Sequence, residues 1–205
     1  MSIQNDNFGD MQQIMIDLAL DGLVNGKQKE TLYSWAKYKL HNSSSAIYLD
    51  VGTNKGNSAI IMASALKHQD PDVPAKVYTV DNYCKSKTPE ADIETAKRNI
   101  SAFDIDDLVS IHIADDMEFI GSLPDSSVDM VFDDSDHSYD ATLNRLRAYL
   151  PKMNKTSLIV GHDFYIDGPS VVRAVGDFRK ENEDIVSILT IDCGMFWMFC
   201  KLEAC

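Results

Sequence analysis

Five aspartates stand where a chemically active site could be built, because each one follows a short apolar stretch of the chain. They are Asp50, Asp81, Asp115, Asp134 and Asp163. Such apolar stretches are typical of buried parallel strands, whose carboxyl ends meet at one edge of a sheet. Buried acids without partners are costly, so a ligand, a metal ion or water must satisfy them. Some of the five could instead cap the helices that follow.

The turn after the first of these aspartates has the composition of a ligand-binding loop. Gly52 and Gly56 follow Asp50 within the segment A-I-Y-L-D-V-G-T-N-K-G-N-S, residues 46–58. Gly52 would let the chain turn sharply, and Gly56 would let the backbone approach a ligand or pack closely. A strand, a glycine turn and a helix together present nucleotide-sized ligands in α/β sheets. The alternative is an ordinary strand-to-helix turn with two glycines.

Two common glycine motifs are missing from this turn. The dinucleotide fingerprint G-x-G-x-x-G does not occur, and the phosphate loop G-x-x-x-x-G-K-[ST] fails because Lys55 precedes Gly56. Asp81, which ends the next predicted strand, could bind the hydroxyls of a ribose. An NAD-linked enzyme remains an alternative, but Asp81 lies further from Gly52 than the ~20 residues typical of that fingerprint.

The elements that must position these residues alternate between strands and helices. Strands are predicted at residues 46–51, 76–80, 109–114, 128–132 and 157–160, with helices at 59–66, 89–103, 117–123, 139–150 and 169–182. Two helices, at 11–22 and 28–40, precede them, and strands at 185–191 and 195–201 form a closing hairpin. This alternation predicts an α/β fold with a doubly wound, mostly parallel sheet.

Length and charge limit the classes of partner. The chain has 205 residues, enough for one domain with a sizeable core. Its formal net charge of -13 works against phosphate backbones and anionic lipids, so we expect neither nucleic acid nor membrane as a partner. No apolar run is long enough to span a bilayer and no signal peptide is recognisable, which predicts a cytoplasmic protein. The cysteines have no C-x-x-C spacing that would indicate a zinc site.

The glycine turn and the acids after the next two strands resemble the class I S-adenosylmethionine-dependent methyltransferases. Two later segments narrow the resemblance. D-M-V-F-D-D-S-D-H-S-Y-D, residues 129–140, is similar to the F-I-D-G-D-H-S-Y signature of one branch, and L-I-V-G-H-D-F, residues 158–164, is similar to its G-H-D-Y segment. This branch, of the methyltransferase domain 24 type, includes the macrocin-type sugar O-methyltransferases and the cephalosporin-hydroxylase-like proteins. It implies a Rossmann-like, seven-stranded sheet of order 3-2-1-4-5-7-6 with an antiparallel last strand and helices on both faces.

The resemblance implies S-adenosylmethionine as the cofactor and assigns parts of it to different segments. The glycine turn would contact the methionyl part, Asp81 would hold the ribose and Asp115 would face the adenine. The expected cofactor-binding residues are Asp50, Gly52, Thr53, Gly56, Ser58, Asp81, Asn82, Asp115, Asp116 and Asp134.

The resemblance also implies transfer of a methyl group to a hydroxyl oxygen of a small acceptor, such as a sugar or a phenol. An alcohol holds its proton tightly, so the reaction needs a base, a metal ion or both. In metal-dependent relatives the histidine of this motif, here His137, acts as the base, and the acid matching Asp134 binds Mg²⁺. Asp163 and His162 would complete the metal site, although His162 is a poorer ligand for Mg²⁺. His137 could instead cap the following helix or bond to the backbone.

Two positions depart from the pattern of this branch. Asp133 replaces an apolar residue and Ser135 replaces a glycine, so Asp133 adds a charge that could strengthen a cation site or reach solvent. We expect one methyltransferase domain over residues 1–205, with 1–45 as a helical extension and 46–205 as the catalytic core. A homodimer is compatible with this organisation. The remaining alternative is a methyltransferase fold that binds a ligand without chemistry, which the intact Asp134 and His137 disfavour.

Overall fold

The structure is a computed structural model that describes residues 26–41, 46–67, 73–164, 169–184, 190–192 and 196–200. The helix predicted at residues 11–22 lies outside these residues, as does most of the tight link predicted between the last two strands. Among the helices that the structure describes, none is long and apolar enough to cross a membrane.

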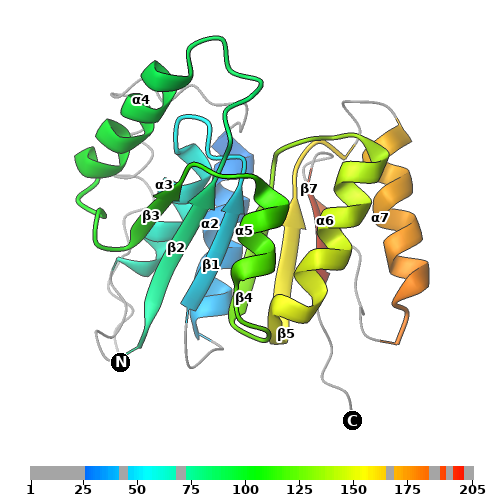
Figure 1. Ribbon diagram of the computed structural model, residues 1–205. Helices are drawn as coiled ribbons and strands as arrows, with labels where there is room; N and C mark the ends of the chain where they lie inside the picture. Colours follow the sequence, from blue (N-terminus) through cyan, green and yellow to red (C-terminus); the bar gives the residue numbers. More distant parts are fainter. Residues whose placement is uncertain are drawn as a thin grey trace.

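Five parallel strands form the centre of the molecule (Figure 1). They are β1 (Ala46–Val51), β2 (Ala75–Val80), β3 (Val109–His112), β4 (Val128–Asp133) and β5 (Met153–Gly161). Their order across the sheet is β3-β2-β1-β4-β5, and each neighbouring pair is parallel. This arrangement confirms the predicted α/β, Rossmann-like fold. Two short strands, β6 (Thr190–Asp192) and β7 (Phe196–Cys200), are the last elements described.

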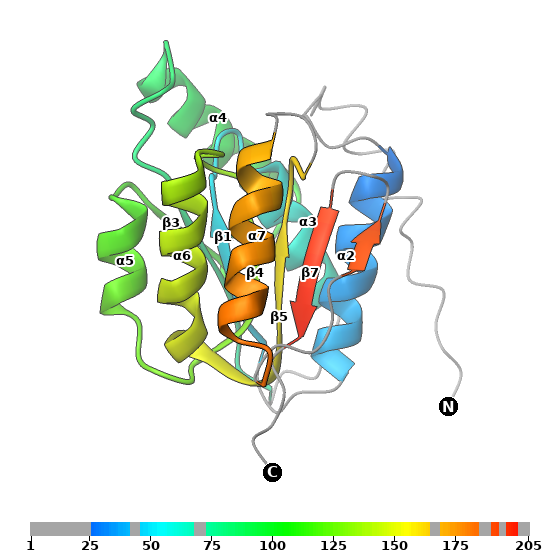
Figure 2. The ribbon, with the colours of Figure 1, turned by 90° about the vertical axis from the view of Figure 1, so that its right-hand side faces the viewer.

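Helices cover both faces of this sheet (Figure 2). They are α2 (Gly26–His41), α3 (Asn57–Leu66), α4 (Pro89–Ala102), α5 (Asp116–Ser122), α6 (Tyr139–Lys152) and α7 (Pro169–Glu181). Successive residues of a strand point to opposite faces, so Tyr48 of β1 packs into a core cluster with α2, α3 and α4. Its neighbour Leu49 packs into a second cluster with α5, α6 and α7. Both faces of the parallel sheet are therefore buried, as its apolar strands require.

Most predicted boundaries agree with the structure to within a few residues. β1 has the predicted bounds, whereas β5 begins earlier than expected, at Met153. Lys155 and Thr156 are exposed and interrupt the apolar pattern there, although the strand continues through them. β3 ends before the exposed Ile113. The end that precedes each aspartate lies within two residues of its prediction in all five strands, whereas the start of β5 lies four residues earlier than expected.

Candidate active site

The glycine turn follows β1 and packs directly against the turn after β4. Gly52 has a φ of +103°, and a Cβ atom at this position would lie 2.2 Å from the backbone oxygen of Asp134. The N–H of Asp134 donates to the Val51 carbonyl at 2.9 Å. Glycine is needed here both for the left-handed backbone and for the close approach. Gly56, with a φ of +87°, instead forms the N-cap of α3.

Asp50 is fully buried beneath this turn. Thr79 donates from Oγ1 to Asp50 Oδ2 at 2.5 Å, and Thr53 shares a hydrogen bond of 2.6 Å with Thr79. Oδ1 of Asp50 has no hydrogen-bond partner among the described residues. Burial raises the pKa of Asp50 to about 7, and the nearby charge of Asp134 adds to this rise. Hydrogen bonds from Ser58 and Thr79 lower the pKa but do not outweigh the burial. A cationic ligand above the turn would stabilise the ionised form of this acid.

Asp81 holds two loops together at the end of β2. One carboxylate oxygen accepts the N–H of Asn54 at 3.0 Å, and the other accepts the N–H of Tyr83 at 2.7 Å. The Tyr83 hydroxyl donates to the Asn54 carbonyl at 3.0 Å, which closes the contact. Asp81 therefore fixes the glycine turn relative to the loop after β2, and each of its oxygens keeps a lone pair for a further donor.

A cavity of about 440 Å³ lies between the glycine turn, the loop after β2 and the turn after β4. Several of the predicted cofactor-binding residues line it, namely Gly52, Asp81, Asn82, Asp116 and Asp134. Thr53, Gly56 and Ser58 are buried in or behind the turn, as is Asp50. Asp115 is exposed and its carboxylate caps α5, accepting the N–H of Glu118 at 3.1 Å. The predicted residues are thus divided between the wall of the cavity and its supporting layer.

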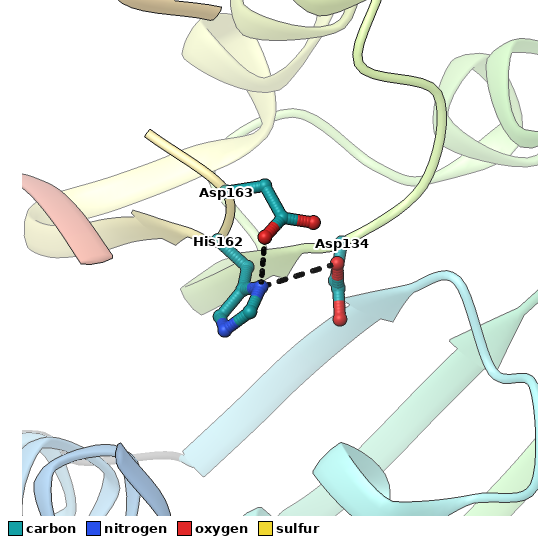
Figure 3. Close-up of side chains that lie close together, drawn as sticks. All are labelled: Asp134, His162 and Asp163. Atoms are coloured by element: carbon teal, nitrogen blue, oxygen red, sulfur yellow. Dashed lines mark ion pairs between the residues drawn. The ribbon is translucent and has the colours of Figure 1, made fainter. Parts of the chain in front are cut away.

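Asp134, His162 and Asp163 come together at the same edge of the sheet (Figure 3). Asp133 and Gly161 are partners in the parallel pairing of β4 and β5, so the residues that follow them are neighbours. Nδ1 of His162 lies 3.0 Å from Asp163 Oδ1 and 3.7 Å from Asp134 Oδ1. One ligand atom from each of the three residues lies within 4.8 Å of the others. The cluster offers one nitrogen and two carboxylates to a single ion.

His137 approaches this cluster from the loop after β4. Its Nε2 lies 3.5 Å from Asp134 Oδ1 and 3.4 Å from Asp163 Oδ2. Burial opposes ionisation of Asp163, but its interactions with His162 and His137 outweigh that effect and lower its pKa. Asp163 also has a φ of +54°, an uncommon conformation for a residue other than glycine. Asp163 thus lies between two imidazoles that favour its ionised form.

Asp133 has a different environment from the one expected. It is buried, and it neither reaches solvent nor joins the cation site. Its Oδ2 accepts from Arg145 Nε at 2.9 Å and from the Tyr149 hydroxyl at 3.0 Å, while Ser135 donates to Oδ1 at 3.0 Å. The expectation that its charge serves a cation site or solvent was therefore wrong, because an internal cation already neutralises it.

Arg145 is the main residue of this region that was not singled out in the sequence. It is buried in α6, and it donates from Nη2 to the carbonyl of Asp136 at 2.6 Å and from Nη1 to Asp116 at 3.4 Å. A signal did exist, because an acid at an apolar position of a buried strand requires a cation nearby. The arginine on the apolar face of the following helix was the available candidate.

The fold is shared with methyltransferases of known structure. The O-methyltransferase TomG from Streptomyces achromogenes, solved with S-adenosylmethionine, is 17% identical over 98% of this chain and 92% of its own, with a TM-score of 0.67. An O-methyltransferase from Bacillus cereus, solved with S-adenosylhomocysteine, is 15% identical over 98% of this chain and 94% of its own, with a TM-score of 0.66. No curated protein sequence matches the chain.

A family model described as a methyltransferase domain matches residues 49–164, which extend from the second half of β1 to the end of β5 and include Asp134, His162 and Asp163. The protein is therefore a class I S-adenosylmethionine-dependent methyltransferase, as the resemblance in its sequence indicated. It belongs to the methyltransferase-domain family that this model defines.

Proposed function

We propose that the protein transfers a methyl group from S-adenosylmethionine to a hydroxyl oxygen of a small acceptor, such as a sugar or a phenol. The proposal rests mainly on the position of Asp134. This residue lines the cofactor-sized cavity and also belongs to the cluster with His162 and Asp163. A methyl donor in the cavity would therefore face the groups that can activate an acceptor. The names of TomG and the Bacillus cereus protein, both O-methyltransferases, support the same reaction.

The cofactor would lie along the cavity with its parts in a fixed order. The buried Asp50, beneath the turn, would balance the ammonium of the methionyl part, with Gly52 allowing close approach. Asp81 would accept from the ribose hydroxyls with the lone pairs that its two backbone donors leave free. Asp116 lines the cavity whereas Asp115 caps α5, which favours Asp116 on the adenine side.

His137 would act as the general base. The bond from the acceptor oxygen to the methyl carbon forms as the sulfonium bond breaks, so S-adenosylhomocysteine leaves with the electron pair. The hydroxyl proton passes to Nε2 of His137, where Asp134 and Asp163 at 3.5 and 3.4 Å would stabilise the resulting imidazolium. In-line alignment of oxygen, methyl and sulfur would come from holding both substrates against this edge.

Asp134, His162 and Asp163 would hold a divalent cation. Two carboxylates and an imidazole fit such an ion, although the nitrogen is not the hard oxygen ligand that Mg²⁺ prefers. When bound, the ion would supply a Lewis acid that lowers the pKa of the acceptor hydroxyl. Mg²⁺ is the ion that the family resemblance implies.

The remaining features of the protein are also proposals. We infer a seven-stranded order of 3-2-1-4-5-7-6, supported by antiparallel pairing of Leu158–Gly161 in β5 with β7, and of β7 with β6. We infer one methyltransferase domain over residues 1–205, with 46–205 as the catalytic core and 1–45 as an extension. We also infer that the protein is cytoplasmic and forms a homodimer. Its acceptor would be a small molecule rather than a nucleic acid, which the net charge of -13 supports.

Formation of S-adenosylhomocysteine tests the reaction. The protein is incubated with S-adenosylmethionine and a panel of sugars and phenols, with and without EDTA, and the products are analysed by mass spectrometry. We expect S-adenosylhomocysteine to form together with an acceptor heavier by one methylene unit, and EDTA to slow the reaction. Calorimetry with S-adenosylmethionine and NAD separates the alternatives, because binding of NAD alone would contradict the proposal. Cofactor binding without any product would instead favour a non-catalytic module.

A further inference from the structure

We propose that the cation site of Asp134, His162 and Asp163 takes a first-row transition metal ion, of the Mn²⁺ to Zn²⁺ series, in place of Mg²⁺. The inference rests on the proposed function only in placing the ion beside the methyl acceptor. The site itself follows from the geometry of the three side chains, whatever acceptor they serve.

The donor atoms of the three side chains lie near the spacing of ligands around a small divalent ion, with His162 and Asp163 already at it. Ligands about 2.1 Å from a metal ion lie roughly 3.0 to 3.4 Å from one another in octahedral or tetrahedral geometry. Nδ1 of His162 is 3.0 Å from an oxygen of Asp163 and 3.7 Å from an oxygen of Asp134. Since the three ligand atoms lie within 4.8 Å of one another, a movement of Asp134 toward His162 would bring them to bonding distance of one ion.

The nitrogen of His162 cannot easily leave this site. The His162 side chain is fully buried, its ring lies 6.5 Å from that of Phe132 between centroids, and its backbone N–H donates to Asp133 at 3.0 Å. Figure 3 shows the imidazole turned so that Nδ1 faces both carboxylates. An ion held by the two acids would therefore have this nitrogen in contact, and water could not readily replace it.

A fixed imidazole changes the preference of the site among cations. Mg²⁺ prefers oxygen ligands in nearly ideal octahedral geometry and keeps several waters. Imidazole nitrogen suits the later first-row ions, with affinity rising from Mn²⁺ through Co²⁺. Three protein ligands also leave positions for water or substrate, which is the arrangement of catalytic rather than structural zinc sites. The acceptor oxygen could occupy such a position.

Metal binding to the full-length protein, with S-adenosylhomocysteine bound, tests the inference without any turnover. We expect calorimetry to give Co²⁺ and Zn²⁺ affinities higher than that of Mg²⁺ by on the order of a hundredfold or more. The variant His162→Asn should lower Co²⁺ affinity by on the order of a hundredfold and change Mg²⁺ affinity by less than about threefold, since only the nitrogen is lost. His112→Asn is the matched control, because His112 ends β3 and packs on Phe119 away from the cluster.

Direct detection of the nitrogen keeps the test independent of whether the variant folds. Electron spin-echo measurements on wild-type protein with Mn²⁺ should show coupling to one imidazole nitrogen, which His112→Asn retains and a folded His162→Asn loses. Mg²⁺ binding as tight as that of Co²⁺, or Mn²⁺ bound without nitrogen coupling, would overturn the inference. Either result alongside formation of methylated product would leave the proposed methyltransferase reaction standing. Nitrogen coupling in a protein that never forms S-adenosylhomocysteine would contradict only the proposed reaction.

Discussion

Asp133 and Asp134 are neighbours in the sequence, but their carboxylates lie in opposite kinds of environment. Asp133 is paired with Arg145, Tyr149 and Ser135 behind the edge of the sheet. Asp134 instead faces His137 and His162 across the open edge. Successive residues at the end of a strand point to different sides, so one step along the chain separates the two environments.

The difference separates structural acids from functional ones. The charge of Asp133 has an always-ionised guanidinium at 2.9 Å and two hydroxyl donors, so nothing remains for a ligand to satisfy. Asp134 and Asp163 have imidazoles, whose charge depends on a proton that a metal ion or a substrate could replace. Asp133, a buried acid whose hydrogen bonds all go to protein donors, is therefore read as part of the framework. Asp134 and Asp163, which share histidines, are read as part of the site.

The largest expected effect is on stability, from removing Asp133. Asp133→Ala removes the nearer counter-ion of the buried Arg145 and leaves only Asp116, at 3.4 Å, which should cost about 3–5 kcal/mol in the free energy of unfolding, measured by urea denaturation. The double variant Asp133→Leu with Arg145→Met should recover most of that loss, because it removes both charges together. A small effect of Asp133→Ala alone would show that the pair is not a structural unit.

The opposite pattern is expected for His137. His137→Ala should lower turnover by about 10²–10⁴-fold through loss of the general base, while S-adenosylhomocysteine affinity, measured by calorimetry, stays nearly unchanged. Its unfolding curve should remain close to that of wild type. A large loss of cofactor affinity would show that His137 binds or supports the cofactor instead.

Asp50 gives an intermediate case, an acid that is buried like Asp133 but has no cation. Its pKa is raised by burial to about 7, so the folded state holds a proton that the unfolded state has released. Stability should therefore fall as pH rises from about 4 to about 7, and level off above that range. Asp50→Asn should be more stable than wild type at pH 8, with the advantage shrinking as pH falls. If the free energy of unfolding depended on pH in the same way for both proteins, Asp50 would have to be charged in the folded state, and the prediction would be wrong.

The smallest expected effect is on cofactor affinity, from Asp81. Asp81→Ala should weaken S-adenosylhomocysteine binding by about tenfold, because a ribose acceptor and the anchor of Asn54 and Tyr83 are both lost. Asp115→Ala is the control from the same edge of the sheet, since Asp115 caps α5 and does not line the cavity. Equal losses in the two variants would contradict the ribose assignment.

Local patterns were sufficient to predict the strand ends that carry the site. The apolar stretch before Asp134 and the one before Asp163 each indicated a buried strand, and parallel pairing brings such ends together. The same reasoning did not separate Asp115 from Asp116. Helix α5 begins between them, and only the bounds of that helix decide which carboxylate caps it and which lines the cavity.

The sequence by itself determined the fold class, the position of the glycine turn and the shared edge that carries Asp134 and Asp163, because each depends on short-range patterns and on the parallel pairing of strands. The resemblance to the methyltransferase branch added His162 to that group. Only the tertiary structure decided which side chains and backbone groups these residues contact. Arg145 reaches Asp133 only because α6 packs its buried face on the sheet, and Gly52 meets the Asp134 carbonyl only because β1 and β4 are adjacent. Contacts between residues distant in the chain depend on that packing, which no local pattern encodes.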